Sequence, residues 1–361
     1  MIDYKNNLIS ITNSILAYYN VKPHHHTNPI LDQVLRLNYK HVIVILLDGM
    51  GMNILNNLEE DTLLRKNVKT ALSSVFPPTT VAATNAFLAG KTPYETGFLG
   101  WTQYNLFEDV TDTIFLKTDY YTNKPINDNL YDRMLPLDFL EQIKEKNPKL
   151  HIESIFPKPI NQSNYETFDE QLDRLLMITK GNESLTYCYY HEPDTTIHTN
   201  GIHGLKTKEV LKKLNESLTA FKESISDDVL TIVVADHGLV DVNYLYLEDY
   251  QEIYQTFYRL PSIESRAMSF FIKPDQTNQF LELFNTHFQP GFKLLTKQEL
   301  LESNLLGQGL KHPLLDSFLG EYIAISTSNK VIAINREETP FKAHHAGLTE
   351  DELMIPLIIL K

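Results

Sequence analysis

The chain has 361 residues, which is enough for one large domain or two smaller ones with a sizeable core. Its formal net charge of −14 at pH 7 argues against a scaffold that binds nucleic acid by neutralising phosphates. The single cysteine, Cys188, excludes an intrachain disulfide and a cysteine-based zinc site, and its apolar neighbours predict a buried structural thiol.

Neither a signal peptide nor a membrane span is expected from the sequence. The first residues lack the basic stretch and apolar core of a signal peptide, and no window approaches the ~20 apolar residues of a membrane span. We therefore expect a cytoplasmic protein without a membrane partner. The oligomeric state leaves no signature in the sequence.

The first expected elements lead to a carboxylate at the end of a strand. An amphipathic helix is expected from Leu8 to Tyr19, and residues 41–47 form an apolar run typical of a strand buried on both faces of a parallel sheet. That strand stops at Asp48. Open α/β sheets bind ligands at the carboxyl ends of their strands, so Asp48 is a candidate metal ligand. Helical spacing then continues over residues 52–65.

A helix with both ends marked follows. The sequence Phe-Pro-Pro-Thr-Thr at residues 76–80 holds the chain extended, the helix begins at Thr79 or Thr80, and Gly90 closes it. A threonine at a helix start is most simply an N-cap. It can also be a nucleophile whose phosphorus target is held by free backbone N–H groups at the positive end of the helix dipole.

The middle of the chain alternates between irregular and regular segments. Residues 91–150 are rich in Tyr and Asp and are expected to stay loop-like until a helix at residues 137–146. A long irregular stretch in a compact domain usually builds the wall of a pocket. The pattern then predicts a short strand at residues 151–156, a helix at residues 168–179 and a buried strand at residues 185–190.

Metal-ligand spacing appears directly after that buried strand. Asp194 and His198 are four residues apart and would share one face of a helical turn, so both could reach one ion. His191 and His203 flank them, and either could face the same site or solvent.

A second acidic strand end follows a long amphipathic helix, expected over residues 206–225. Residues 229–235 form another buried apolar run, which stops at Asp236 and His237. Two acidic strand ends far apart in sequence suggest one shared metal site.

The remaining residues suggest an insertion into a core domain. Residues 239–335 alternate between strands and helices and are expected to form a small inserted α+β subdomain, in which residues 322–326 and 331–334 pair as strands. Residues 1–238 and 336–361 are expected to form the core domain. Its expected fold is α/β, with a doubly wound, mostly parallel central sheet and helices on both faces.

The segment that follows the expected insertion adds a histidine to the candidate ligands. His344 and His345 lie in a loop before the closing strand, and one of them joins Asp48, Asp194, His198, Asp236 and His237. Oxygen and imidazole ligands without thiolates suit Zn²⁺, with Mn²⁺ as the alternative. Two sets of three ligands would hold two ions roughly 4 Å apart, as two-metal phosphoryl-transfer sites do. One ion would activate the threonine hydroxyl, and the other would stabilise the leaving alkoxide.

Five short motifs occur along the chain, and their order and spacing are more informative together than any one motif alone. They are Leu-Asp-Gly at residues 47–49, Phe-Pro-Pro-Thr-Thr at 76–80, Asp194-x-x-x-His198, Ala-Asp-His-Gly at 235–238 and His-Ala-Gly-Leu at 345–348. Their order and spacing resemble the alkaline phosphatase superfamily, and most closely its type I phosphodiesterase/nucleotide pyrophosphatase branch. The resemblance covers most of the chain. It implies a doubly wound α/β sheet, two zinc ions and a covalent phospho-threonine intermediate.

The resemblance also divides the candidate ligands into two sets. One zinc ion would be held by Asp194, His198 and His345, and the other by Asp48, Asp236 and His237, with the nucleophile bridging them. The family's nucleophile lies four residues after the phenylalanine of its motif, which selects Thr80 over Thr79. The family's last ligand precedes a glycine-rich turn, which selects His345 over His344.

One stretch departs from the family pattern. Family diesterases commonly place, beyond the nucleophile, an asparagine that hydrogen-bonds the phosphoryl oxygen, where this chain has Trp101 and Thr102. Asn85 is a candidate substitute, and an ordinary helix residue is the alternative interpretation. The departure leaves the phosphoryl contact, and with it a nucleotide substrate, open.

Together these patterns predict a phosphoric ester hydrolase that acts on a small phosphate ester. It would cleave a phosphodiester or pyrophosphate bond through a phospho-threonine intermediate at a two-metal site. A phosphomonoesterase and a phosphonate hydrolase are alternatives on the same core, and a catalytically inactive binding module is the alternative from a different class. A sulfatase is disfavoured because the Cys/Ser-x-Pro-x-Arg setting is absent around Thr80, and phosphoglycerate mutases of this superfamily use a serine nucleophile. All candidate ligands and the hydroxyl are present, which favours an active enzyme.

Overall fold

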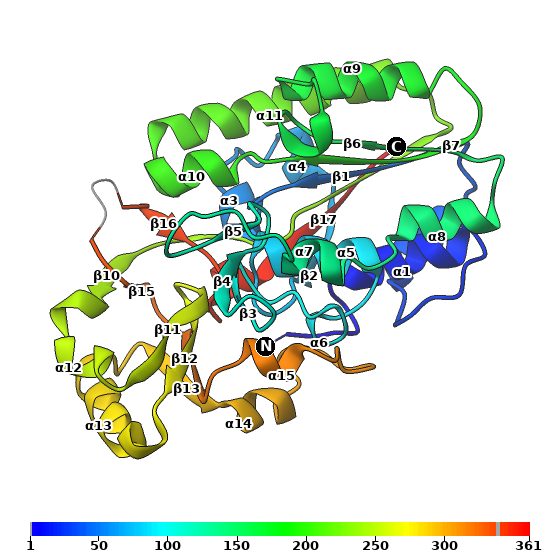
Figure 1. The fold of residues 1–361 in the computed structure, drawn as a ribbon. Coiled ribbons are helices and arrows are strands. Elements are labelled where there is room, and N and C mark those ends of the chain that lie inside the picture. Colours follow the sequence, from blue (N-terminus) through cyan, green and yellow to red (C-terminus); the bar gives the residue numbers. More distant parts are fainter. Residues whose placement is uncertain (1, 337–339) are drawn as a thin grey trace.

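The computed structural model of the chain describes residues 2–336 and 340–361 (Figure 1). Residue 1 and residues 337–339, which fall in the expected core domain, lie outside the described residues. Two large sheets dominate the fold, one of six strands and one of seven. Among the described helices, none is long and apolar enough to cross a membrane.

The six-stranded sheet is the centre of the α/β part of the fold, and its strand order is β2-β17-β8-β1-β7-β6. Its strands are β1 (His41–Leu47), β2 (Val68–Ser73), β6 (His151–Ile155), β7 (Ser184–Tyr190), β8 (Val229–Val234) and β17 (Met354–Leu360). β1 runs parallel to both of its neighbours, β7 and β8, and every residue of β1 is buried. β17 is antiparallel to its neighbours. The apolar run at residues 41–47 is therefore covered on both faces.

Helices cover both faces of this sheet (Figure 1). One layer contains α1 (Leu8–Tyr18), α5 (Thr80–Ala89) and α8 (Phe139–Lys146), which contact one another. The other contains α4 (Leu63–Lys66), α9 (Phe168–Ile178), α10 (Asp194–Asn200) and α11 (Leu205–Ser224). This arrangement confirms the expected doubly wound α/β fold.

The helix expected over residues 52–65 is divided in two. α3 (Met52–Leu55) ends with Asn56 as its C-cap, and α4 starts after Thr62 as its N-cap. The connecting sequence contains Asn56, Asn57 and Asp61. Short polar side chains of this kind compete for backbone hydrogen bonds and favour caps and turns over the helix interior.

The seven-stranded sheet is antiparallel, with the order β13-β14-β12-β11-β3-β4-β5. Its strands are β3 (Thr102–Asn105), β4 (Val110–Thr113), β5 (Thr118–Asp119), β11 (Phe257–Glu264), β12 (Ala267–Ile272), β13 (Phe292–Thr296) and β14 (Tyr322–Ser326). β3, β4 and β5 lie in the stretch that was expected to be loop-like, so that expectation was wrong. Because these strands are short and polar, they lack the apolar alternation that marks a strand in the sequence. The domain boundaries at residues 239–335 stay a prediction.

The expected pairing of residues 322–326 with residues 331–334 was also wrong. β14 pairs with β12 and β13, whereas β15 (Lys330–Ala333) runs parallel to β10 (Asn243–Tyr246). The guanidinium of Arg266 explains this, since it donates to the carbonyls of Ser328 and Lys330 at 2.7 Å each and holds the connection away from a tight hairpin.

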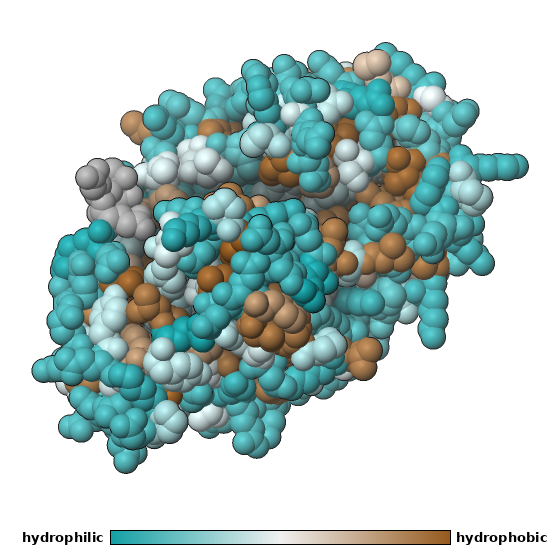
Figure 2. Space-filling view, in the orientation of Figure 1, coloured by the Kyte–Doolittle hydropathy of each residue, from teal (hydrophilic) through white to brown (hydrophobic). Residues whose placement is uncertain are grey.

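Shorter elements connect these layers. They are α2 (Pro29–Leu35), α6 (Pro93–Thr96), α7 (Leu130–Met134), β9 (Val240–Asp241), α12 (Gln251–Tyr254), α13 (Thr277–His287), α14 (Lys297–Glu302), α15 (Leu315–Phe318), β16 (Ala343–His344) and α16 (Glu350–Leu353). A cluster of aromatic residues that includes Phe280 and Phe284 packs α13 against the seven-stranded sheet. The visible surface is mostly hydrophilic and is hollowed between the region of α9 and α10 and the region of β4 and β5 (Figures 1 and 2).

Candidate metal centre

The ends of β1 and β8 bring two carboxylates together. The strands are adjacent in register, with Leu46 opposite Val234, so Asp48 and Asp236 leave the sheet side by side. The Gly49 N–H donates to Asp236 Oδ1 at 3.0 Å. Gly49 has φ +69°, and a Cβ there would lie 2.9 Å from Asp194 Cβ. Only glycine fits this turn without strain, because the position combines a left-handed backbone with a close approach.

The first candidate ligand set consists of Asp48, Asp236 and His237, whose ligand atoms all lie within 4.8 Å of one another. His237 Nε2 lies 3.4 Å from Asp48 Oδ1 and 3.5 Å from Asp236 Oδ2. Asp236 Oδ2 is buried and has no hydrogen-bond partner among the described residues. A buried carboxylate oxygen without a donor carries a desolvation cost that a cation would offset.

The second candidate set consists of Asp194, His198 and His345, again within 4.8 Å. Asp194 lies in the first turn of α10, and its N–H donates to the Asp48 carbonyl at 3.1 Å, which places it beside the first set. His198 Nε2 lies 3.2 Å from Asp194 Oδ2, and His198 Nδ1 lies 2.8 Å from the Ala343 carbonyl. When Nδ1–H donates to a carbonyl, Nε2 carries no proton and its lone pair is available to bind a metal, as in many metal-bound histidines.

The electrostatics of the two sets favour a bound cation. Burial raises the pKa of Asp48 well above its usual value, and the nearby carboxylates of Asp236 and Asp194 raise it further. Burial also raises the pKa of Asp236, against the opposing effect of His237. Burial together with the neighbouring histidines lowers the pKa of His345 well below its usual value, which keeps the ring neutral. Crowded buried carboxylates beside the neutral His345 ring match the oxygen and imidazole donor set of a divalent metal site.

The residues fit a pair of metal ions for a further reason. The rings of His237 and His345, one from each set, stack with centroids 3.9 Å apart. Asp194 Oδ1 is also buried without a hydrogen-bond partner among the described residues. Each set therefore offers a carboxylate oxygen with no competing donor.

Thr80, at the start of α5, faces the first ligand set. Its Oγ1 lies 3.4 Å from both carboxylate oxygens of Asp48 and 3.2 Å from His237 Nε2. The hydroxyl of Thr79 points elsewhere and donates to Glu264 Oε1 at 2.6 Å. Of the two threonines, the fold brings Thr80 to the candidate ligands.

The start of α5 also presents free donors. The first helical hydrogen bond runs from the Ala83 N–H to the Thr79 carbonyl at 2.8 Å. Thr79 occupies the N-cap position but makes no side-chain capping bond. Within the part of the chain that the structure describes, the N–H groups of Thr80, Val81 and Ala82 have no acceptor. These N–H groups lie at the positive end of the helix, beside the Thr80 hydroxyl.

The remaining candidate histidines lie outside the two sets. His344 Nε2 is hydrogen-bonded to the Tyr244 hydroxyl at 2.8 Å. His203 Nδ1 is bonded to Asn57 Oδ1 at 2.8 Å, and the ring of His191 packs against Tyr190.

The candidate substitutes for the family's asparagine are engaged elsewhere. Asn85 is buried and donates to the Val81 carbonyl at 2.8 Å, inside its own helix. The Thr102 hydroxyl accepts from the Ile263 N–H at 3.0 Å in the pairing of β3 with β11. The Trp101 N–H donates to Glu264 at 2.7 Å. A contact from Asn85 or Thr102 to a phosphoryl group is therefore not supported.

Two residues at this centre were missed in the sequence. The Tyr189 hydroxyl donates to Asp48 Oδ2 at 2.5 Å, and Glu264 binds the residue before Thr80. Burial raises the pKa of the Glu264 carboxyl. A tyrosine in a buried strand needs a hydrogen-bond partner, which is a signal that could have been used for Tyr189. No local pattern marks Glu264, because its position depends on the seven-stranded sheet.

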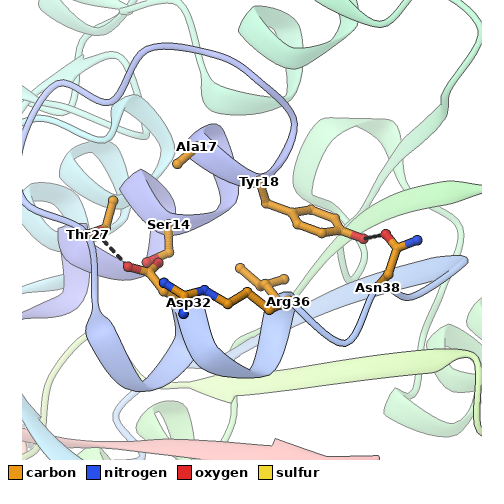
Figure 3. Close-up of a pocket in the computed structure, with 8 residues that line it drawn as sticks. Ser14, Ala17, Tyr18, Thr27, Asp32, Arg36 and Asn38 are labelled. Carbon is orange, nitrogen blue, oxygen red and sulfur yellow. Dashed lines mark hydrogen bonds between the residues drawn. The ribbon is translucent and has the colours of Figure 1, made fainter.

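A cavity of about 380 Å³ lies away from this centre, beside α1 and α2. Figure 3 shows its lining, in which the Thr27 hydroxyl donates to Asp32 and the Tyr18 hydroxyl donates to Asn38. The cavity lining includes none of the candidate metal ligands.

Comparisons with known proteins agree with the fold and the motifs. The family model "Type I phosphodiesterase / nucleotide pyrophosphatase" matches residues 42–287. No curated protein sequence matches the chain.

Several solved structures match most of the chain. Murine ectonucleotide pyrophosphatase/phosphodiesterase 5 matches with a TM-score of 0.68 at 14% identity, covering 88% of this chain and 87% of that chain. An inactive variant of the murine protein in complex with AMP matches with a TM-score of 0.67 at 12% identity, covering 89% and 87%. The human protein matches with a TM-score of 0.66 at 12% identity, covering 88% and 87%. At such identities the likeness to these structures shows the fold.

Proposed function

The chain belongs to the type I phosphodiesterase/nucleotide pyrophosphatase family of phosphoric ester hydrolases, and we propose that it works through a covalent intermediate on Thr80. The observation that carries this proposal is the position of Thr80 Oγ1, 3.4 Å from Asp48 and 3.2 Å from His237. Thr80 is the first residue of α5 and follows the N-cap Thr79, and its hydroxyl faces a cluster of acidic and imidazole groups.

Two divalent metal ions are the proposed cofactors. Asp194, His198 and His345 would hold one ion, and Asp48, Asp236 and His237 would hold the other. Oxygen and imidazole ligands suit zinc, with manganese as the alternative. When bound, such ions lower the pKa of a nucleophilic hydroxyl and stabilise the charge on a leaving oxygen. Burial of every candidate ligand supports this assignment, since unpaired buried carboxylates are costly without a cation.

The chain's own residues would position the reacting groups. Thr80 Oγ1 would form a bond to phosphorus as the bond from phosphorus to the leaving oxygen breaks, and water would then cleave the threonine ester. The free N–H groups at the start of α5 would donate to the phosphoryl oxygens. The Tyr189 hydroxyl, bonded to Asp48, would hold that carboxylate in one orientation.

A nucleotide-containing diester or pyrophosphate is the proposed substrate class. One support is that a protein of the same fold has been solved in complex with AMP. The other is the supply of backbone donors at α5, which can hold a phosphoryl group without the family's asparagine.

Three chromogenic esters test this proposal. Thymidine 5′-p-nitrophenyl phosphate and bis-p-nitrophenyl phosphate should be hydrolysed, and p-nitrophenyl phosphate should be a poorer substrate. EDTA should abolish the activity, and zinc or manganese should restore it. Preferential hydrolysis of the monoester would instead establish a phosphomonoesterase, and no turnover of any ester by the metal-loaded protein would overturn the proposal.

A further inference from the structure

A carboxylate from the seven-stranded sheet reaches the start of the helix that carries Thr80. Glu264 is the last residue of β11, at the turn into β12. Its Oε1 accepts two hydrogen bonds, from the Thr79 hydroxyl at 2.6 Å and from the Trp101 N–H at 2.7 Å. Glu264 Oε1 therefore connects the end of β11 to the residue before Thr80 and to the loop before β3.

The backbone around Glu264 is strained in a way that fixes this contact. Ile263, the preceding residue, has φ +82°, which is rare for a β-branched side chain. Gly100 passes so close that a Cβ there would lie 2.7 Å from the Ile263 carbonyl oxygen and 2.9 Å from Glu264 Cγ. Strained residues of this kind persist only where surrounding structure holds them, and they concentrate at functional sites. The geometry thus aims Glu264 at Thr79.

The hydrogen bond from Thr79 changes what that residue does to α5. Thr79 has the extended backbone of an N-cap, with φ −143° and ψ 149°, and a threonine hydroxyl there normally accepts from an N–H in the first turn. Its hydroxyl instead donates to Glu264, and no capping bond forms. The N–H groups of Val81 and Ala82 are the ones such a cap would occupy.

We propose that Glu264 is a positioning residue that prevents the Thr79 hydroxyl from capping α5. The first-turn N–H groups then stay available to the phosphoryl group that Thr80 attacks. This inference rests on the proposed function. It assigns to the β11–β12 turn a role at the reacting centre, although among the described residues the hydrogen bonds of Glu264 go to Thr79 and Trp101 and not to the candidate ligands or Thr80.

A double-mutant cycle tests the inference with a nucleotide p-nitrophenyl ester. Glu264→Ala releases Thr79 to cap the helix, and kcat should fall by about tenfold or more, since losing a single oxyanion donor costs ~10²-fold or more in well-studied enzymes. Thr79→Ala removes the competing hydroxyl and should keep most of the activity. The double variant, which has no hydroxyl to form the cap, should recover to within about threefold of Thr79→Ala.

Two further variants separate positioning from folding. Glu264→Gln keeps a side-chain oxygen acceptor and should retain most of the activity. Thr79→Asp provides a strong N-cap whose carboxylate turns away from Glu264 by repulsion, so kcat should fall in a protein that still melts cooperatively. Glu321→Ala is the matched control: Glu321 also accepts a backbone N–H, from Ile272, but at the opposite end of β12.

The outcomes distinguish this inference from the proposed function. If the wild-type protein hydrolyses none of the esters, the proposed function fails. If the wild type is active and Glu264→Ala matches it, or the double variant is as slow as Glu264→Ala, the capping mechanism is wrong. Should Glu264→Ala fail to fold, Thr79→Asp decides the question, because a folded and fully active Thr79→Asp protein contradicts the inference.

Discussion

The imidazole rings of His237 and His345 stack with their centroids 3.9 Å apart, although the residues belong to different candidate ligand sets. The stacked rings place the two ligand sets side by side. Two ions held by these adjacent sets would be able to act on the same phosphoryl group. The fold achieves this by bringing the end of β8 and the loop before β17 to the same edge of the central sheet.

Metal content should follow from this arrangement. The purified chain, reconstituted with zinc, should hold about two equivalents, as two-metal hydrolases do. His345→Ala should remove roughly one equivalent and most of the activity, because Asp194 and His198 alone would bind weakly. Elemental analysis after gel filtration measures both values. His344→Ala is the control, since His344 is bonded to Tyr244, and it should keep both ions. A wild-type protein that binds no metal would contradict the account.

The hydroxyl of Tyr189 should matter for metal affinity. It donates to Asp48 Oδ2, and loss of a residue that orients a metal ligand typically costs about 10- to 100-fold in affinity or activity. Tyr189→Phe should therefore need more zinc to reach half-maximal activity. Tyr190→Phe is the control on the same strand, because its ring stacks on Phe168 instead. Equal zinc dependence in both variants would show that the hydrogen bond does not tune the site.

A buried ion pair should hold the loop that carries His345. Arg266 donates to both carboxylate oxygens of Glu352 at 2.6 and 2.7 Å, and both side chains are fully buried. Glu352 Oε1 also accepts from the Gly347 N–H at 2.7 Å, beside Ala346 with φ +88°. Arg266→Met leaves a buried carboxylate unpaired and should cost about 3–5 kcal/mol of unfolding free energy.

Urea denaturation measures that cost. The variant with both Arg266→Met and Glu352→Met should be more stable than Arg266→Met alone, because neither charge is then left buried. If the double variant instead loses as much stability as Arg266→Met and Glu352→Met lose together when each is measured alone, the two side chains do not act as a pair.

One histidine outside the two candidate ligand sets should contribute to the pH dependence of stability. Burial lowers the pKa of His312, whose Nδ1 accepts from the Leu314 N–H at 3.3 Å. The unfolded chain takes up this proton near pH 6.5, whereas the folded chain takes it up at lower pH, so stability is present above about pH 6.5 and is lost as pH falls below it. His312→Asn should show a smaller fall in melting temperature between pH 7.5 and pH 5.5 than the wild type. An identical fall in both proteins would contradict this assignment.

The central sheet and most of the candidate centre were predictable because their signals are local. The apolar run before Asp48 and the same pattern before Asp236 fix buried strands, and strand ends in a parallel sheet share one edge. The spacing of Asp194 and His198 fixes a shared helical face, as α10 shows. Parallel pairing in register then brings residues from distant segments together.

The seven-stranded sheet was less predictable because its pairings are not local. β3 and β4 are short and polar, and β3 pairs with β11, more than a hundred residues away. Glu264 follows the strained residue Ile263 at the end of β11, and its partner Thr79 lies at the start of α5 in another layer. Sequence periodicity carries no information about such a contact, since it depends on how two sheets pack.

Rapid quenching of the reaction with a nucleotide p-nitrophenyl ester, followed by peptide mass spectrometry, tests the central claim most directly. The account predicts a phosphorus-containing adduct on Thr80 and none on Thr79. It also predicts a loss of about 10³-fold or more in kcat for Thr80→Ala, since the nucleophile supplies the covalent step. Thr79→Ala should keep the adduct and most of the activity. An adduct on Thr79, or a Thr80→Ala protein that still hydrolyses the ester at the wild-type rate, would contradict the account.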